Sequence, residues 1–416
     1  MPRADMRRGV LLRCYLLLSY LFPLVAPFIL KKRLAKGKEH EARWVEKLGQ
    51  GLAPRPDGPL IWLNAVGLGE ILSLRGLIAR MHQLRPDLSF LVTSTTATSA
   101  QVFSKNLPPR TLHQFLPIDG PGPRARFLDH FQPDLCIWAE QDLWPGFVSS
   151  LAKRHIPQAI VAARMNQTSF QSHRRARGVY RDLYGAMDLV SAQDDATAAH
   201  LNALGAQATA TGSLKPAAPT LGCDEQELAA LTKRVQGRRV WATAPSHQAD
   251  ENIALAAHQQ LLKDDPTALL IIAPRFPQRS DIAPDGTPRR SNGQSPTATD
   301  GIWLCDTFGD LGLVYRLAKT VLVGGTFDDT EGHNPWEAAA LGATVIHGPR
   351  TENFANDFKM LNQSDASVRV TNVHDLYDAL RRNDLQNIAQ RSSDVVTTAS
   401  ESTGKLASDL IALMDR

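Results

Sequence analysis

Three short motifs in the sequence hold residues whose types and spacing could support chemistry. In the first, residues 64–70 (NAVGLGE), an apolar run leads into two glycines and then a carboxylate. Glycines permit a tight turn, and the dipole of a following helix favours the ionised form of a carboxylate in its first turn. Glu70 is therefore a candidate general base. The alternative, which spacing alone favours, is that Glu70 only caps the helix.

The second motif is residues 241–251 (WATAPSHQADE), followed after one more apolar run by residues 273–279 (APRFPQR). Ser246 and His247 come directly after an apolar run and could contact a phosphate. Arg275 follows the next run and could bind the same phosphate through two parallel hydrogen bonds. Taken alone, His247 is better explained as a polar residue that is satisfied at a helix start than as a catalytic residue.

The third motif joins residues 323–327 (VGGTF) to residues 331–349 (EGHNPWEAAALGATVIHGP). Gly324 and Gly325 would let a ligand approach the backbone. Asn334 would begin a helix whose free amides suit a phosphate or a ribose, and Glu337 could accept from two ribose hydroxyls. A plain helix start with a favourably placed glutamate remains the alternative.

The sequence lacks the motifs of P-loop nucleotide binding, serine hydrolases, nucleotide-bound metals and paired cysteines. It has no G-x-x-x-x-G-K-[ST], no G-x-S-x-G and no D-x-D cluster, and its four cysteines show no C-x-x-C spacing. We therefore expect neither a metal nor a cofactor. If a nucleotide leaves during the reaction, Arg275, Lys215 and helix termini would stabilise its negative charge in place of a divalent ion.

The motifs lie on a regular alternation of apolar runs and amphipathic stretches, which predicts parallel sheets covered by helices. The 416 residues are enough for two or three domains. Strands are expected at residues 60–66, 89–93, 112–116, 134–139, 158–162, 189–192 and 208–211, and again at 239–243, 268–273, 301–305, 320–323 and 343–347. Two doubly wound domains in series are the simplest account. Residues 281–300 lack periodicity and predict a mobile surface loop.

The N-terminus combines an apolar segment with basic charge. Residues 14–30 (CYLLLSYLFPLVAPFIL) carry no charge, and residues 1–50 hold eleven Lys or Arg against four acids, while the whole chain is only +4. This pattern predicts contact with an anionic membrane rather than nucleic acid, through either a marginal span or an in-plane anchor that Pro23 and Pro27 would kink. A buried first helix and a cleaved secretory signal are the alternatives; no small-x-small cleavage site is present. The basic cluster after the segment predicts a cytoplasmic main body.

Together with TSTTATS at residues 93–99, AEQDLWP at 139–145, TGSLK at 211–215 and DTFGDLGLVYRLA at 306–318, these motifs resemble the Kdo transferase family over nearly the whole chain. Its members are membrane-associated, inverting glycosyltransferases of the GT-B architecture. They transfer 3-deoxy-D-manno-octulosonic acid (Kdo) from CMP-Kdo to lipid A precursor (lipid IVA) in lipopolysaccharide biosynthesis. The resemblance implies CMP-Kdo, lipid A precursor and inner-membrane lipid as partners, with no nucleic acid and no metal.

The resemblance also implies an arrangement of domains. We expect an anchor and basic segment at 1–50, an acceptor-binding Rossmann-like domain at 51–211, a linker at 212–222 and a CMP-Kdo-binding Rossmann-like domain at 223–384. The two α/β domains would face a central cleft, and a C-terminal helix at 385–416 could cross back to the first domain. The enzyme would sit on the cytoplasmic face of the bacterial inner membrane.

Site residues follow from the matching positions. Glu70 would be the base that deprotonates the acceptor hydroxyl. The expected donor-binding residues are Lys215, Ser246, His247, Arg275, Gly324, Gly325, Thr326, Asn334 and Glu337. The expected acceptor-binding residues are Gly69, Thr95, Glu140 and Asp142, with Lys31, Lys32 and Arg33 meeting the lipid phosphates.

The sequence departs from the family at several positions near these residues. Gly67 replaces a serine, Asp142 and Asp250 replace glutamates, Pro245 replaces a hydroxyl residue, Ala249 replaces a glycine, and Phe276 and Gln278 replace a histidine and a glutamate. Two alternatives therefore stay open: a non-catalytic paralogue that binds lipid A precursor, and a nucleotide-sugar epimerase of the same architecture.

Overall fold

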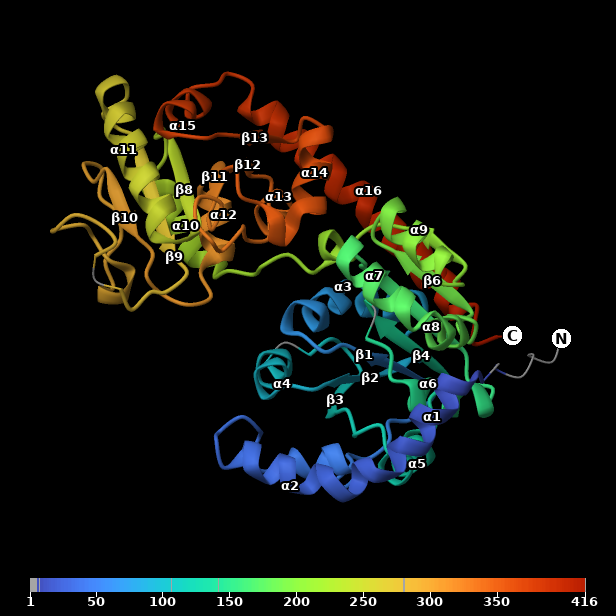
Figure 1. Cartoon of the computed structure of the whole chain (residues 1–416). Helices are drawn as coiled ribbons and strands as arrows, with labels where there is room; N and C mark the ends of the chain where they lie inside the picture. The colour runs from blue at the N-terminus through green and yellow to red at the C-terminus, as the bar shows by residue number, and fades with distance from the viewer. Residues whose placement is uncertain (1–5, 7, 106, 141, 280, 416) are drawn as a thin grey trace. The chain divides into compact units, whose positions relative to one another are not determined.

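The computed structural model describes residues 6, 8–105, 107–140, 142–279 and 281–415 (Figure 1). The chain divides into two compact units. The first comprises Met1–Ala218 and Ala399–Arg416, and the second comprises Pro219–Thr398. The boundary between Ala218 and Pro219 falls within the linker expected at 212–222.

The first unit is built on a seven-stranded parallel sheet in the order β3-β2-β1-β4-β5-β6-β7. Its strands are β1 (Leu60–Asn64), β2 (Ser89–Ser94), β3 (Thr111–Phe115), β4 (Leu135–Ala139), β5 (Gln158–Ala163), β6 (Leu189–Ala192) and β7 (Ala208–Ala210). Its helices include α3 (Leu68–Leu84), α4 (Ala97–Ser104), α5 (Pro121–Phe131), α6 (Pro145–Lys153), α7 (Gln167–Arg175), α8 (Arg177–Tyr184) and α9 (Asp195–Ala203), with 3-10 turns η2 (Trp44–Leu48) and η3 (Lys215–Ala217).

Alternation along β1 shows how this sheet is buried on both faces. Trp62 packs on one face in a cluster with Trp138 and Phe147, and its ring centroid lies 5.4 Å from that of Trp138. The neighbouring Leu63 packs on the other face, in the cluster that contains Leu74 of α3. Because successive side chains of a strand point to opposite faces, a continuously apolar strand of this kind requires cover on both sides.

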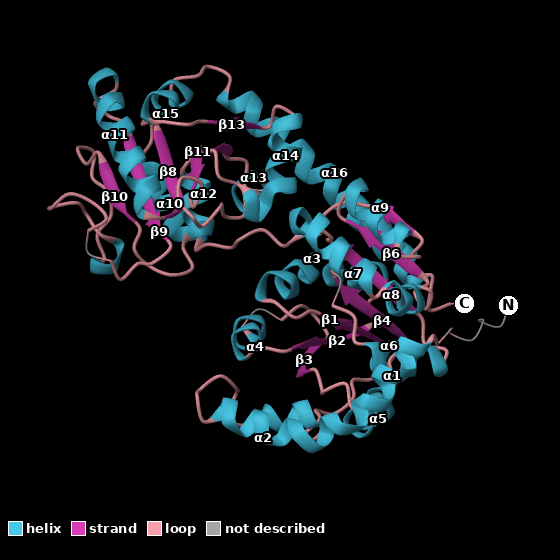
Figure 2. Ribbon diagram, in the orientation of Figure 1, coloured by secondary structure: helices cyan, strands magenta, loops and turns pink. Residues whose placement is uncertain are grey.

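The second unit is built on a six-stranded parallel sheet in the order β10-β9-β8-β11-β12-β13, flanked by helices (Figure 2). Its strands are β8 (Val240–Ser246), β9 (Leu269–Pro274), β10 (Ile302–Leu304), β11 (Thr320–Val323), β12 (Thr344–His347) and β13 (Ser367–Arg369). Its helices are α10 (Glu225–Arg234), α11 (Gln248–Asp264), α12 (Leu311–Leu317), α13 (Trp336–Ala339), α14 (Ala355–Gln363) and α15 (Val373–Leu380), with 3-10 turns η4 (Arg290–Asn292) and η5 (Glu352–Phe354). Two Rossmann-like α/β domains are thus confirmed.

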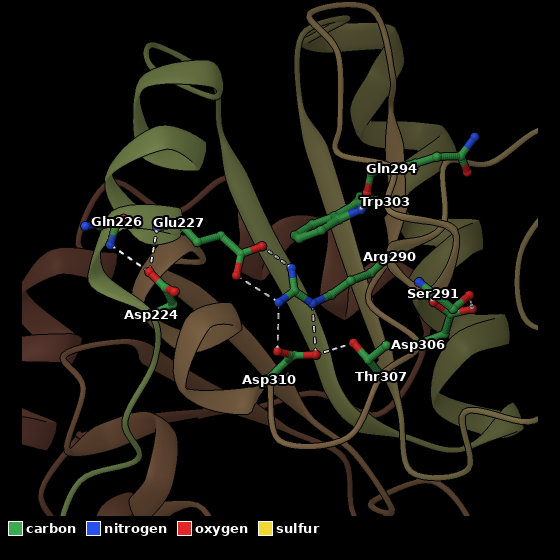
Figure 3. A network of polar contacts seen from close by, with 10 residues as sticks. All are labelled: Asp224, Gln226, Glu227, Arg290, Ser291, Gln294, Trp303, Asp306, Thr307 and Asp310. Carbon is green, nitrogen blue, oxygen red and sulfur yellow. Dashed lines mark hydrogen bonds and ion pairs between the residues drawn. The ribbon is translucent and has the colours of Figure 1, made fainter.

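The segment expected to be a mobile loop is tied down at its middle. Arg290, in η4, pairs with Glu227 of α10 and with Asp310, and its Nε lies 2.9 Å from Asp310 Oδ2 (Figure 3). The next residue, Ser291, donates its backbone N–H and its hydroxyl to Asp306. The segment predicted to be a mobile surface loop thus contacts residues that lie 15 to 63 positions away in sequence.

Helix α16 (Leu385–Ile411) belongs to both units. Its residues up to Thr398 lie in the second unit, and those from Ala399 onward lie in the first. There Leu406 and Leu410 are buried in the same apolar cluster as Leu74 and Ile78 of α3. The C-terminal end of the chain thus completes one face of the first sheet.

The apolar N-terminus forms α1 (Val10–Leu18), a 3-10 turn η1 (Ser19–Leu21) and α2 (Phe22–Leu34). One side packs on the first unit: Leu12 is fully buried, and the Tyr15 hydroxyl donates to Asp119 at 2.9 Å. The other side is exposed at Val10, Leu11, Leu17, Leu18, Tyr20, Leu21, Leu24, Val25, Phe28 and Ile29. Residues Val10–Leu34 form a stretch long and apolar enough to cross a membrane, with a mean hydropathy of 1.7 over an 18-residue window. A wholly buried first helix is excluded.

Candidate active site

In the first unit, candidate residues gather at the carboxyl ends of the parallel strands. Glu70 lies in the first turn of α3, which follows β1, while Thr95 follows β2 directly. Glu140 and Arg164 come directly after β4 and β5. Ligands of open parallel sheets bind at this edge, so the arrangement matches a binding site.

The Glu70 carboxylate caps its own helix. Its Oε2 accepts hydrogen bonds from the backbone N–H groups of Val66, at 2.9 Å, and Gly67, at 3.3 Å. Glu70 therefore does cap the helix, as the alternative proposed. Capping does not exclude a catalytic role. The side chain remains partly exposed, and the two N–H groups fix its orientation.

Glu140 is the most perturbed carboxyl at this edge. Burial, and next the charge of Glu70, raise the pKa of Glu140 to about 7, while Lys215 and Arg164 oppose the increase. Its backbone has φ 57°, a left-handed conformation that is uncommon for a residue with a side chain. Strained, electrostatically shifted residues concentrate at functional sites.

Asp142 belongs to the same electrostatic group. Burial, followed by the charge of Glu70, raises the pKa of Asp142. The structure therefore brings together three acids that sequence analysis selected, Glu70, Glu140 and Asp142. It adds Arg164, which the sequence did not single out because no motif contains it. Lys215, expected at the donor, lies in the first unit beside Glu140.

Two other acceptor candidates lie near this edge. Gly69 is exposed, and a Cβ added there would meet no atom within 4 Å. Thr95 is half-buried, and its carbonyl accepts from Lys47 Nζ at 2.8 Å. Lys47 also pairs with the buried Glu39, so the loop after β2 is held from the N-terminal segment.

The basic residues at the end of α2 divide into two kinds. Lys31 and Lys32 are exposed. Arg33 instead directs its Nε at Glu39 Oε1, 2.5 Å away. The structure thus gives Arg33 a role in fastening the turn after α2, and contact with lipid phosphate stays a prediction for all three residues.

In the second unit, the remaining donor candidates lie at the equivalent edge. His247 follows β8, Arg275 follows β9, and Gly324 and Gly325 follow β11. The glycines are needed for packing. A Cβ on Gly324 would come within 2.1 Å of the Pro245 carbonyl oxygen, and Gly325 has φ 69° and would press on His333.

Two predicted donor contacts are buried and engaged elsewhere. Ser246 is fully buried and donates its hydroxyl to Glu251 at 2.8 Å. Thr326 is also fully buried; its hydroxyl donates to the Val323 carbonyl and accepts from the Gly348 N–H. Neither hydroxyl is placed to meet a phosphate, so a contact of Thr326 with the nucleotide would have to come from its backbone.

Sequence analysis passed over Asp250 as a site residue, but it joins two of the motifs. Its carboxylate accepts from the N–H groups of His247, at 3.0 Å, and Gly325, at 2.7 Å. Burial raises the pKa of Asp250 to about 6, against these hydrogen bonds. Two signals could have found it: its position three residues after His247, typical of a capping residue, and its match to a glutamate of the related family.

His333 was also missed, and it faces His247. The two Nε2 atoms are 2.8 Å apart and the rings stack with centroids 5.1 Å apart. Asp328 lies on the other side of His247, with Oδ2 3.6 Å from Nδ1. Because 86 residues separate the histidines in sequence, spacing alone could not pair them.

Asn334 and Glu337 lie together, with Asn334 Nδ2 donating to Glu337 Oε1 at 3.3 Å. Burial raises the pKa of Glu337, while Asn334 and Arg275 oppose this. The helix expected to begin at Asn334 is only α13, four residues from Trp336. It is too short for its dipole to form a phosphate site, so recognition there depends on side chains.

Within the residues that the structure describes, no group of three His, Cys, Asp or Glu side chains could hold a metal ion. The expectation of metal-independent chemistry stays a prediction.

The two parallel-sheet α/β units define a class of protein, the two-domain proteins with a GT-B-like fold. A UDP-GlcNAc 2-epimerase from Neisseria meningitidis, solved with UDP-GlcNAc, has a similar fold with a TM-score of 0.53, covering 85% of this chain and 100% of that one. At 13% identity this likeness concerns the fold alone.

Sequence comparison resolves the family within that class. Residues 42–218 match the family model described as 3-deoxy-D-manno-octulosonic-acid transferase (kdotransferase). The 3-deoxy-D-manno-octulosonic acid transferase of Rickettsia bellii is 31% identical over 89% of this chain and 90% of its own length. That of Haemophilus influenzae is 30% identical over 83% of each. The chain belongs to the 3-deoxy-D-manno-octulosonic acid transferase family of glycosyltransferases, which confirms the resemblance seen in its motifs.

Proposed function

We propose that this protein is an inverting Kdo transferase that moves Kdo from CMP-Kdo to a hydroxyl of lipid A precursor. The observation that carries the proposal is the acidic group in the first unit, where two backbone N–H groups orient Glu70 and the charge of Glu70 contributes to the raised pKa of Glu140. One such carboxylate is what a single displacement needs as its base.

In this mechanism Glu70 accepts the proton of the acceptor hydroxyl as the hydroxyl oxygen attacks the anomeric carbon of Kdo. The bond between that carbon and the phosphate oxygen breaks, and CMP leaves with the electron pair. Glu140, with its pKa raised to about 7, is partly protonated near neutral pH and can donate a hydrogen bond to a sugar oxygen. Lys215 and Arg164 balance the remaining negative charge.

The second unit supplies the donor contacts. Arg275 is exposed at the end of β9, where its guanidinium can bind the phosphate of CMP-Kdo. Glu337 and Asn334 bind the ribose hydroxyls, since Glu337 offers a second carboxylate oxygen beyond the one bonded to Asn334. No step of this proposal requires a metal.

The N-terminal segment anchors the enzyme in the plane of the membrane. Gly9 donates its N–H to Asp182, and Tyr15 donates to the buried Asp119. A segment standing across the bilayer would lose these contacts or carry both carboxylates into hydrocarbon, which is costly. Lying flat, it keeps them, turns its exposed apolar side to the acyl chains and presents Lys31 and Lys32 to anionic headgroups.

The proposal is tested by incubating the purified full chain with CMP-Kdo and lipid A precursor and following CMP release together with the mass of the lipid. We expect CMP and Kdo-bearing lipid in equal amounts. CMP-Kdo binding without release would favour a non-catalytic paralogue, and turnover of a UDP-sugar alone would favour an epimerase.

A further inference from the structure

Two histidines in the second unit share a proton. The 2.8 Å contact between His247 Nε2 and His333 Nε2 requires one nitrogen to carry hydrogen and the other to accept it. Each ring also has a second nitrogen, and that of His247 faces Asp328 at 3.6 Å. The pair can therefore accept one additional proton and keep its contact, whereas two would set N–H against N–H and break it.

The charges around the pair come from several elements. His247 faces the acids Asp328 and Glu251 and the cations Arg275 and Arg279, while His333 faces Asp328, Arg275 and His247 itself. Burial, His247 and Arg275 lower the pKa of His333 to about 4, and burial also lowers the pKa of His247. Both shifts favour the neutral form of the pair in the absence of a ligand.

The two acids beside the pair already have other partners. Glu251 pairs with Arg279, with 2.5 Å between Oε2 and Nη2, and accepts from Ser246. Asp328 accepts from the Thr330 N–H at 2.9 Å. Arg275, by contrast, is exposed at the edge of the sheet, so an anion that binds it changes the charge felt by both rings.

We propose that the His247–His333 pair takes up one proton when a phosphate binds at Arg275, and that this protonated pair is part of the phosphate site. An anion next to the rings favours their charged form, and it also cancels the opposing charge of Arg275. The inference rests on the proposed function only in placing the donor phosphate at Arg275.

The sign of the pH dependence follows. The pair binds more protons in the complex than in the free protein. Phosphate affinity therefore rises as the pH falls from the pKa of the pair in the complex to its pKa in the free protein. Uptake of one proton limits the increase to about tenfold per pH unit. The effect saturates once the free pair is also protonated.

The test uses cytidine 5′-methyl phosphate as the probe, because a phosphodiester keeps a single charge over this range whereas CMP titrates. Calorimetric titration of the full chain between about pH 6 and pH 8, in buffers of different ionisation enthalpy, gives both affinity and proton uptake. We expect tighter binding at low pH with net uptake of up to one proton. His333→Asn should still bind at the high-pH limit but with a smaller slope and a smaller uptake, because His247 alone then remains to take up the proton.

His374→Asn is the matched control, since His374 is an exposed histidine on α15 of the same unit. It should behave as the unmodified protein does. Affinity independent of pH in the unmodified protein, or an undiminished slope in His333→Asn, would overturn the inference and leave the donor site standing. If the protein is folded by circular dichroism and binds no probe at any pH, both the proton uptake and the donor site at Arg275 are contradicted.

Discussion

The carboxyl ends of the parallel strands carry acidic residues in the first unit and basic residues in the second. In the first, carboxyl groups crowd together, and burial raises the pKa of Glu140 to about 7. In the second, an exposed arginine stands beside two histidines, and burial lowers the pKa of His333 to about 4. The first edge is suited to removing a proton from a neutral alcohol, and the second to holding an anion. One parallel fold thus supports both tasks through the residues that follow its strands.

The largest effect is expected from removing the base of the first unit. Glu70→Gln keeps the size of the side chain but cannot accept the proton, so kcat for Kdo transfer should fall by about 10² to 10⁴. CMP release under saturating substrates measures the rate. Glu401→Gln, at an exposed position of α16, is the control and should be fully active. Activity of Glu70→Gln within about twofold of normal would remove Glu70 from the mechanism.

Removing Arg275, the exposed arginine at the end of β9, should weaken donor binding. A charge-assisted hydrogen bond contributes about 1.5–3 kcal/mol, so Arg275→Gln should raise the KM for CMP-Kdo by about tenfold to a hundredfold. Steady-state kinetics with CMP-Kdo varied measures this. Arg382→Gln, at an exposed arginine that pairs with Asp384, is the control. An unchanged KM would place the phosphate elsewhere.

The proposed anchor places membrane contact in the first unit, which contains the N-terminal segment. Lys32→Gln should weaken binding to vesicles with anionic headgroups by about fivefold, since each basic residue near the surface contributes about 1 kcal/mol. Cosedimentation at low and high salt measures the difference, which should shrink with salt. Lys263→Gln, exposed on α11 of the second unit, should have no effect. Equal losses for both variants would contradict the assignment.

The smallest effect concerns stability. Because the pKa of Glu140 is raised in the folded chain, its contribution to stability is complete below its ordinary value of 4.5 and is lost as the pH rises through about 7. Glu140→Gln should remove that loss. Its Tm relative to the unmodified protein should therefore rise by a few degrees between pH 5 and pH 8. Parallel Tm curves would show that Glu140 ionises normally.

Much of the scaffold was predictable because its strands are continuous apolar runs. Residues 320–323 were placed as a strand and form β11 (Thr320–Val323). β13 (Ser367–Arg369) was missed because three partly exposed residues leave no apolar run. Within the mobile loop predicted at 281–300, Arg290 has partners in α10 and just before α12, and composition could not reveal these pairings.

The site was only partly predictable, for a related reason. A motif identifies which residues follow a strand but not which way each side chain points, so exposed Arg275 and fully buried Ser246 looked alike. Pairings across the chain were invisible, such as His247 with His333 and Arg33 with Glu39. Glu70, Glu140 and Asp142 were each selected through motifs, but their mutual influence emerged only in the folded unit.

The division of labour between the two edges is tested most directly by measuring kcat and the KM for CMP-Kdo of Glu70→Gln and Arg275→Gln side by side, with lipid A precursor as acceptor. We expect Glu70→Gln to lower kcat and leave KM nearly unchanged, and Arg275→Gln chiefly to raise KM. If both substitutions changed the same parameter to the same extent, the assignment of proton removal to the first unit and anion binding to the second would be contradicted.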